Sequence, residues 1–120
     1  MSIVTPAWRA LADFPGYEIS EEGDVRCWTY RGRKLTAPRE IIAYLTNSNR
    51  WAVKLMKVDE TTKKSHRHTM SLAVLVLLTF QGNPGRNETF EVDFKDDNPY
   101  NIHSRNLSWR KNLQKFKELT

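Results

Sequence analysis

The chain has 120 residues, of which 39% are hydrophobic and 28% charged, so it is long enough for one modest core and too apolar for a disordered chain. Its formal net charge of +5 attracts polyanions, which include nucleic acids, anionic membrane surfaces and acidic proteins. Cys27 is the single cysteine, which excludes an internal disulfide and any zinc site built on paired cysteines.

The first residues contain no charged leader followed by an apolar run, so we expect no signal peptide. The longest apolar run, residues 72–78, is far shorter than the roughly 20 residues that cross a bilayer. We therefore expect an intracellular, cytoplasmic protein that has no membrane partner.

The first forty residues predict a β-hairpin followed by a loop. Tyr17 and Ile19 alternate with polar residues, as do Val25 and Cys27, and a Glu-Glu-Gly-Asp turn separates the two pairs. Period-2 alternation on both sides of a Gly-Asp turn is typical of a short hairpin. Residues 31–40 are basic and contain Gly and Pro, which predicts a loop close to a ligand or in solvent.

The middle of the chain predicts a second hairpin and one ambiguous element. Apolar residues alternate along residues 51–56, which indicates a strand with one buried face. The polar residues 59–68 are expected to form the loop and the return strand. In residues 72–78, β-branched side chains favour a strand, whereas the length of the run and Ser71 in an N-cap position favour a buried helix.

Toward the end of the chain, short apolar segments at residues 90–92 and 107–109 flank a loop rich in Asn and Asp. We expect two strands there. Residues 110–120 predict a helix, because Leu113 and Phe116 lie on one helical face.

Two motifs resemble parts of phage HNH homing endonucleases. Residues 8–26 read W-x-x-L-x-x-F-P-G-Y-E-I-S-x-x-G-x-V-R and are similar to the NUMOD4 motif at the front of many of these enzymes. Residues 92–109 read V-D-F-K-D-D-N-P-Y-N-I-H-S-R-N-L-S-W and are similar to their HNH module, a ββα-metal or His-Me finger. The strand at residues 51–55 and the apolar segment at residues 72–80 fit the same module. The resemblance extends over residues 8–117.

This resemblance implies a centre for metal-dependent phosphodiester hydrolysis. In the family a His activates water as the general base, and a neighbouring Asp or Asn and a later helix residue hold a divalent ion. Here Phe94 occupies the general-base position and Lys115 the helix position, so Asp93 alone remains. We therefore expect an inactive centre with no cofactor, and Mg²⁺ or a similar ion if activity persists.

Two side chains leave an active site open as an alternative. His103 lies in the same loop and is a candidate replacement base, and a shift of three residues would bring Asn112 to the ligand position in place of Lys115. With Asp93, they define the alternative of an active metal-dependent DNA endonuclease that nicks or cuts both strands. The resemblance also implies that four polar side chains brace the loop, namely Asp96, Asn98, Asn101 and Asn106.

The basic residues predict an extended nucleic-acid footprint. No acidic residue lies between Val25 and Arg39, and Trp28 within this stretch is the exposed aromatic candidate for contact with DNA. His66 and His68 lack acidic or Cys companions, so solvent or phosphate contact is favoured there over zinc. Lys and Arg displace counterions from phosphates and give salt-sensitive affinity. We expect backbone contacts from Arg26, Arg31, Arg33, Lys34, Lys54, Lys63, Lys64 and Arg67.

The predicted fold class is α+β, with a NUMOD4-like β-hairpin region in residues 1–50 and an HNH-like ββα module in residues 51–120, together one compact unit. The predicted function is binding of nucleic acid without cleavage, as a phage regulatory or inhibitory factor. DNA is the first expected partner and RNA the second. A protein-protein inhibitor of a host nucleic-acid enzyme is a further alternative.

Overall fold

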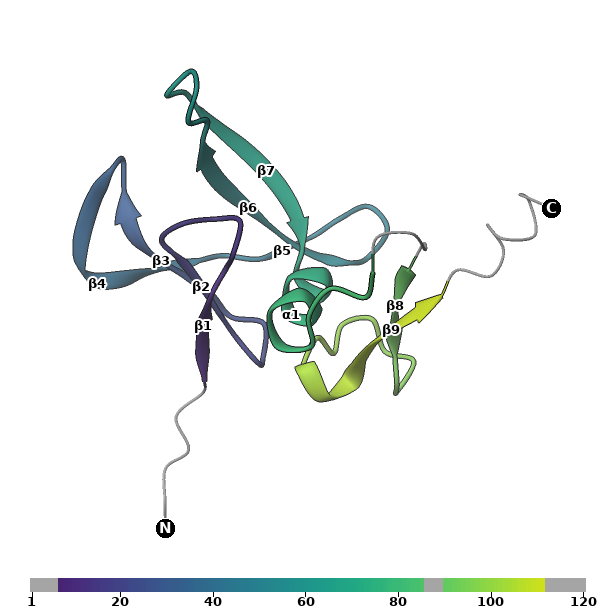
Figure 1. Cartoon of the computed structure of the whole chain (residues 1–120). Coiled ribbons are helices and arrows are strands. Elements are labelled where there is room, and N and C mark those ends of the chain that lie inside the picture. The colour runs from purple at the N-terminus through teal and green to yellow at the C-terminus, as the bar shows by residue number, and fades with distance from the viewer. Residues whose placement is uncertain (1–6, 86–89, 112–120) are drawn as a thin grey trace, which may run out of the picture.

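The computed structural model describes residues 7–85 and 90–111, in which small antiparallel sheets surround one α-helix (Figure 1). In chain order the elements are β1 (Trp8–Ala10), β2 (Tyr17–Ser20), β3 (Val25–Tyr30), β4 (Arg33–Ile41), β5 (Tyr44–Leu45), β6 (Trp51–Val58), β7 (Ser65–Ser71), α1 (Leu72–Phe80), β8 (Phe90–Phe94), the short 3-10 helix η1 (Ser104–Asn106) and β9 (Leu107–Lys111).

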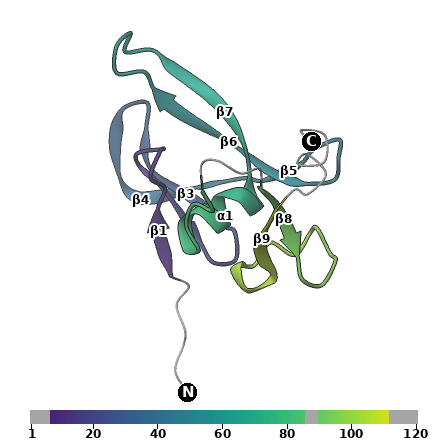
Figure 2. The same ribbon diagram turned by 45° about the vertical axis from the view of Figure 1, so that its right-hand side comes forward.

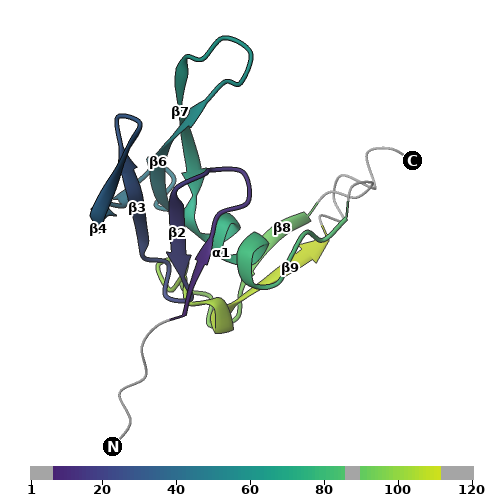
Figure 3. The ribbon, with the colours of Figure 1, turned by 60° about the vertical axis from the view of Figure 1, so that its left-hand side comes forward.

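The strands pair in the orders β1-β2-β3-β4, β5-β6-β7 and β8-β9. The hairpins β3–β4 and β6–β7 project from the body on the side away from β8 and β9, as the three views agree (Figures 1, 2 and 3). Antiparallel sheets with a helix agree with the predicted α+β class. No helix in the described ranges is long and apolar enough to cross a membrane.

The ambiguous apolar run is the helix α1, which begins after Ser71. The Ser71 hydroxyl accepts a hydrogen bond from the Val74 backbone N–H at 3.4 Å, as an N-cap does. The helix contacts β2, β6, β7, β9 and η1, so most of its faces are covered, while Leu78 stays exposed. An apolar sequence on all sides is what such a central helix requires.

One hydrophobic core joins the two halves of the chain. Ile19 comes from the N-terminal sheet, Leu55 from the second sheet, Leu77 from α1 and Leu107 from β9, and each is fully buried. These side chains belong to the same buried cluster. The N-terminal hairpin and the later elements are therefore stabilised by shared packing.

The prediction of a loop over residues 31–40 was wrong, because most of this segment is β4. Tyr30 pairs with Arg33, so Arg31 and Gly32 form a two-residue hairpin loop with positive φ angles of 50° and 79°. Positive φ at both loop residues is the geometry that matches the twist of a hairpin. Pro38 is tolerated because β4 is an edge strand.

The turn at Gly23, in the first hairpin, packs against the Asn- and Asp-rich loop. Gly23 has a φ of +89°, and a Cβ atom at this position would lie 2.9 Å from Cγ1 of Ile102. The backbone N–H of Ser104 donates to the carbonyl oxygen of Glu21 at 2.8 Å. The N-terminal region thus helps to position the loop that carries the candidate site.

The predicted helix over residues 110–120 was wrong at its start, since residues 110 and 111 belong to β9. The rest of that prediction lies outside the described residues. The strands expected at residues 17–27, 51–56, 90–92 and 107–109 are confirmed.

Candidate functional site

The loop between β8 and β9 is held together by Asp96 and Asn106. The Asp96 carboxylate accepts hydrogen bonds from Nδ2 of Asn101 at 2.8 Å, from Nδ2 of Asn106 at 2.9 Å and from the backbone N–H of Asn98 at 2.8 Å. Asn106 also accepts from the Asp96 backbone N–H at 3.0 Å and donates to the Asn101 carbonyl oxygen at 2.8 Å. These bonds, with Asn101 as the largest cause, lower the pKa of Asp96. The loop is therefore built around an ionised carboxylate.

The predicted base and metal positions, Phe94 and Asp93, lie on β8 of the β8–β9 ribbon. Phe94 packs against the core, whereas Glu91 and Asp93 meet Arg110 from the neighbouring strand. Arg110 is paired with Glu91 in the register; its Nη2 lies 2.7 Å from Glu91 Oε1, and its Nη1 lies 3.6 Å from Asp93 Oδ1. The hydrogen bond to Glu91 is the largest cause of the raised pKa of Arg110. A single guanidinium thus bridges both carboxylates.

A cavity of about 410 Å³ lies beside this ribbon, and Asp93, Phe94, Asp97, Arg50 and Arg110 are among its lining residues. The Arg50 guanidinium carbon lies 5.6 Å from the centre of the Phe94 ring, within the range of a cation–π contact. Within residues 7–85 and 90–111, Arg50 has no carboxylate at ion-pair distance. The hydrogen bonds of its side chain to other described residues are long, at 3.5 Å, and go to two backbone carbonyl oxygens of the preceding turn.

The described side chains at the predicted base and metal positions offer neither a base nor an unpaired carboxylate. Phe94 has no lone pair that could accept a proton, and the cation that Asp93 meets is the Arg110 guanidinium. His103 Nδ1 accepts a hydrogen bond from the Arg105 backbone N–H at 3.1 Å, so it caps η1. In the described part of the chain, no three His, Cys, Asp or Glu residues gather as a metal site. The candidate positions Asn112 and Lys115 lie outside it.

Arg26 and Trp28 take part in a local network around Glu18. Arg26 Nε lies 2.8 Å from Glu18 Oε1, and the guanidinium carbon lies 4.0 Å from the centre of the Trp8 ring. Trp28 Nε1 donates to the same carboxylate oxygen at 2.5 Å. The hydrogen bond from Trp28 is the largest cause of the lowered pKa of Glu18. Both predicted DNA-contacting side chains therefore already have partners within the protein.

The hairpin β3–β4 carries the exposed cations of the first basic cluster. Arg31 and Arg39 lie over the Tyr30 ring, at 5.3 and 5.0 Å from its centre. Arg33 and Lys34 are exposed on β4 immediately after the turn. Because both guanidinium groups contact Tyr30, this ring supports cations and is poorly placed to stack on bases.

The hairpin β6–β7 carries the second cluster. Lys54 and Arg67 lie on the same face of this ribbon in its register, and Lys54 Nζ lies 5.4 Å from the centre of the Tyr44 ring. The His68 ring packs edge-on against Phe14 at 5.6 Å between centroids, so it belongs to the edge of the core. Lys54 and Arg67 are therefore on the opposite face to the core, whereas Lys57 is on the core side, with its Nζ 5.8 Å from the centre of the Phe14 ring.

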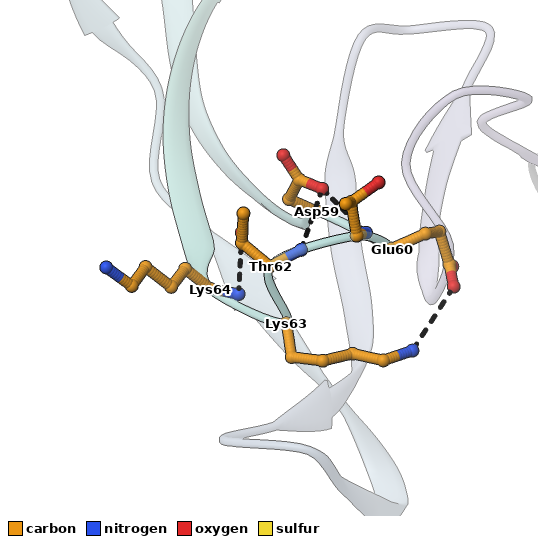
Figure 4. Close-up of polar contacts among 6 residues, drawn as sticks. Asp59, Glu60, Thr62, Lys63 and Lys64 are labelled. Carbon is orange, nitrogen blue, oxygen red and sulfur yellow. Dashed lines mark hydrogen bonds and ion pairs between the residues drawn. The ribbon is translucent and has the colours of Figure 1, made fainter.

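The tip of this hairpin is drawn in Figure 4. Asp59 accepts hydrogen bonds from the backbone N–H groups of two tip threonines, at 2.8 and 3.2 Å, and these bonds lower its pKa. Lys63 pairs with Glu60 at 3.7 Å, while the Lys64 side chain extends in another direction (Figure 4). Two carboxylates thus accompany the two predicted phosphate-contacting lysines of the tip.

Sequence reasoning missed two cations of the candidate site, Arg50 and Arg110. Arg50 lies forty-four positions before Phe94, and no local pattern indicates their contact. The position of Arg110 opposite Glu91 depends on the strand register. The alternation of β8 and β9 would have pointed to this pair if the register had been known.

No protein-family model and no curated protein matches the sequence. Among solved structures, the chain is similar to the HNH homing endonuclease I-HmuI, which was solved in a study of its DNA binding and cleavage. The match covers 93% of this chain with a TM-score of 0.65 and 21% identity, and the chain spans 56% of the I-HmuI chain. The predicted HNH-like scaffold is confirmed at the level of the fold. The NUMOD4 likeness and the phage origin stay predictions.

Proposed function

We propose that this protein binds nucleic acid, and DNA in the first place, on an HNH endonuclease scaffold that does not cleave it. The likeness to I-HmuI supports the choice of partner class, since that protein binds and cleaves DNA. The observation that carries the non-catalytic part is the ion pair of Asp93 with Arg110, next to Phe94 in the general-base position. The protein would act intracellularly by occupying its site, in a phage regulatory or inhibitory role.

The chemistry of phosphodiester hydrolysis supports the proposed loss of cleavage. Water must lose a proton to a base as it attacks, and the side chain of Phe94 offers none. A cation held by Asp93 would have to displace a guanidinium that also hydrogen-bonds Glu91 at 2.7 Å. RNA is the second candidate ligand, because contacts of basic side chains with backbone phosphates position a nucleic acid and carry little sequence information.

The two projecting hairpins supply the proposed phosphate contacts. Their cations have no carboxylate partner among the described residues, apart from Arg26 and Lys63, and the net charge of the chain is +5. Lys and Arg side chains on separate arms release counterions from several phosphates at once. We assign the backbone contacts to Arg31, Arg33, Lys34, Lys54, Lys64 and Arg67, with Arg26, Trp28 and Lys63 in supporting positions.

The test of binding is fluorescence anisotropy with labelled duplex DNA over a series of NaCl concentrations. We expect Kd to rise steeply with salt, with a log-log slope of magnitude near 4–6 if about five or six phosphates are neutralised. The same measurement with labelled RNA hairpins and labelled single strands shows which type of nucleic acid the protein prefers. Failure of every nucleic acid to bind at low salt would overturn the proposal and favour the protein-protein inhibitor.

The test of cleavage is nicking of supercoiled plasmid with MgCl₂ or MnCl₂, for the natural sequence and for Asp93→Ala. We expect no nicking by either protein. Metal-dependent nicking that disappears in Asp93→Ala would show an active endonuclease and contradict the inactive-centre proposal. Nicking that persists in Asp93→Ala indicates a contaminating nuclease, and the assay is then repeated on repurified protein.

A protein partner is the second candidate, and one feature favours it. A groove of about 440 Å³ lies between the projecting hairpins, and the exposed side chains of Tyr30, Met56 and Val58 help to line it. Exposed apolar groups of this kind mark many protein interfaces. Capture of a host nucleic-acid enzyme by a protein that shows no nucleic-acid affinity at low salt would support this candidate.

A further inference from the structure

Two guanidinium groups line the cavity where an active HNH centre would need a base and a cation. Arg50 reaches it from the turn before β6 and lies over the Phe94 ring. Arg110 reaches it from β9 and bridges Glu91 and Asp93. The positive charge that a divalent ion would bring to this cavity is thus supplied by two arginine side chains.

Arg110 changes the electrostatics of the cavity. Glu91 and Asp93 both lie on β8, two residues apart, and without a counter-charge they would repel an approaching phosphate. The bridging guanidinium offsets one of their two negative charges and hydrogen-bonds Glu91 through two of its nitrogen atoms, at 2.7 and 3.1 Å. An arginine is always charged near neutral pH, so this neutralisation needs no ion from solution.

Arg50 is the cation of this cavity that is available to a ligand. It has no carboxylate partner among the described residues, and its hydrogen bonds to backbone carbonyls are at the 3.5 Å limit. The centre of the Phe94 ring lies 5.6 Å from its guanidinium carbon, within cation–π range. A guanidinium held in this way presents donors in a fork that matches two phosphate oxygens.

We propose that this cavity holds a backbone phosphate of the bound nucleic acid without a metal ion. Arg50, beside the Phe94 ring, contacts the phosphate, and Arg110 is a positioning residue that offsets one of the two negative charges of Glu91 and Asp93. The proposal rests on the proposed nucleic-acid binding and names one anchoring site within it. The half-buried ring of Phe94 then serves as a support for the Arg50 guanidinium.

The first experiment compares duplex affinity for three single variants in EDTA at low salt. Arg50→Gln and Arg110→Gln should each weaken binding by on the order of tenfold, because the first removes the cation at the phosphate and the second leaves the charge of Glu91 and Asp93 without its offset. Arg105→Gln is the matched control, since it removes the same charge from an exposed residue of the β8–β9 loop that does not line the cavity and should change Kd by less than about threefold. Equal effects of all three substitutions would overturn the proposal.

The second experiment separates neutralisation from direct contact by Arg110. In a Glu91→Gln/Asp93→Asn background the two carboxylates that Arg110 contacts are gone, although Asp97 still lines the cavity, so adding Arg110→Gln should change Kd by less than about threefold. Adding Arg50→Gln to that background should still weaken binding by about tenfold. A full effect of Arg110→Gln in this background would contradict the neutralising role. A requirement of the natural sequence for MgCl₂ at matched ionic strength would contradict metal-free binding.

The third experiment uses inorganic phosphate and no nucleic acid. NMR of the arginine Nε–Hε groups should show a saturable shift for Arg50 on titration with phosphate, and sodium chloride at equal ionic strength should not reproduce it. Absence of this shift overturns the anchoring site even if duplex DNA binds. Conversely, a saturable Arg50 shift in a protein that binds no nucleic acid would support the site and refute the proposed function.

Discussion

Removal of the Asn106 side chain should destabilise the protein by roughly 2 kcal/mol. Asn106 is nearly buried, with 8% of its surface exposed, and its amide makes hydrogen bonds of 2.8, 2.9 and 3.0 Å across the loop. Each such bond contributes about 0.5–1.5 kcal/mol. We take the lower half of that range, because Asp96 and Asn101 are close to solvent and can bind water once Asn106→Ala removes their partner.

The measurement is urea denaturation followed by tryptophan fluorescence, in which an unchanged m-value shows that the unfolded state is comparable. A loss of roughly 2 kcal/mol should lower Tm by about 8 °C in a chain of this size. The control is Asn98→Ala, whose side chain accepts a single exposed bond from the Tyr100 backbone N–H at 3.1 Å and should cost less than about 0.5 kcal/mol. If Asn106→Ala is no more destabilising than this control, Asn106 does not brace the loop.

Three further substitutions test other parts of the fold. Gly23→Ala should destabilise the protein by at least about 1 kcal/mol more than Gly32→Ala in the same urea assay, because both have positive φ but only the first would place a methyl group against Ile102; equal losses would refute this close approach. Ser71→Ala should lower the free energy of unfolding by about 0.5–1 kcal/mol through loss of the α1 cap, whereas Ser71→Asp should retain most of it. The folded-state pKa of Asp96 is below its unfolded value, so its stabilisation is complete above about pH 4 and is lost as the pH falls through the folded pKa. Thermal melts over this acid range should show a smaller pH dependence for Asp96→Asn than for the natural sequence, and identical curves would contradict the shift.

The sequence contains the local parts of this fold. Alternating apolar residues identified strands at residues 17–27 and 51–56, since a strand places every second side chain on the core. The Asn- and Asp-rich motif predicted side chains that hydrogen-bond within one loop, and such bonds join residues a few positions apart. The assignment of Phe94 to the general-base position uses only the motif and its spacing, and it stays a prediction.

Other features depend on pairings that the sequence does not display. Residues 31–40 look like a loop, yet an Arg-Gly turn and a partner strand make most of them β4. The apolar run after Ser71 is a helix because other elements cover its faces.

The candidate site depends most on tertiary structure. The strand register places Arg110 opposite Glu91, and the packing of the turn before β6 places Arg50 over Phe94. Periodicity reports how a residue relates to its neighbours in the chain. It contains no information on which distant charge will face it, because that depends on the packing of the whole core.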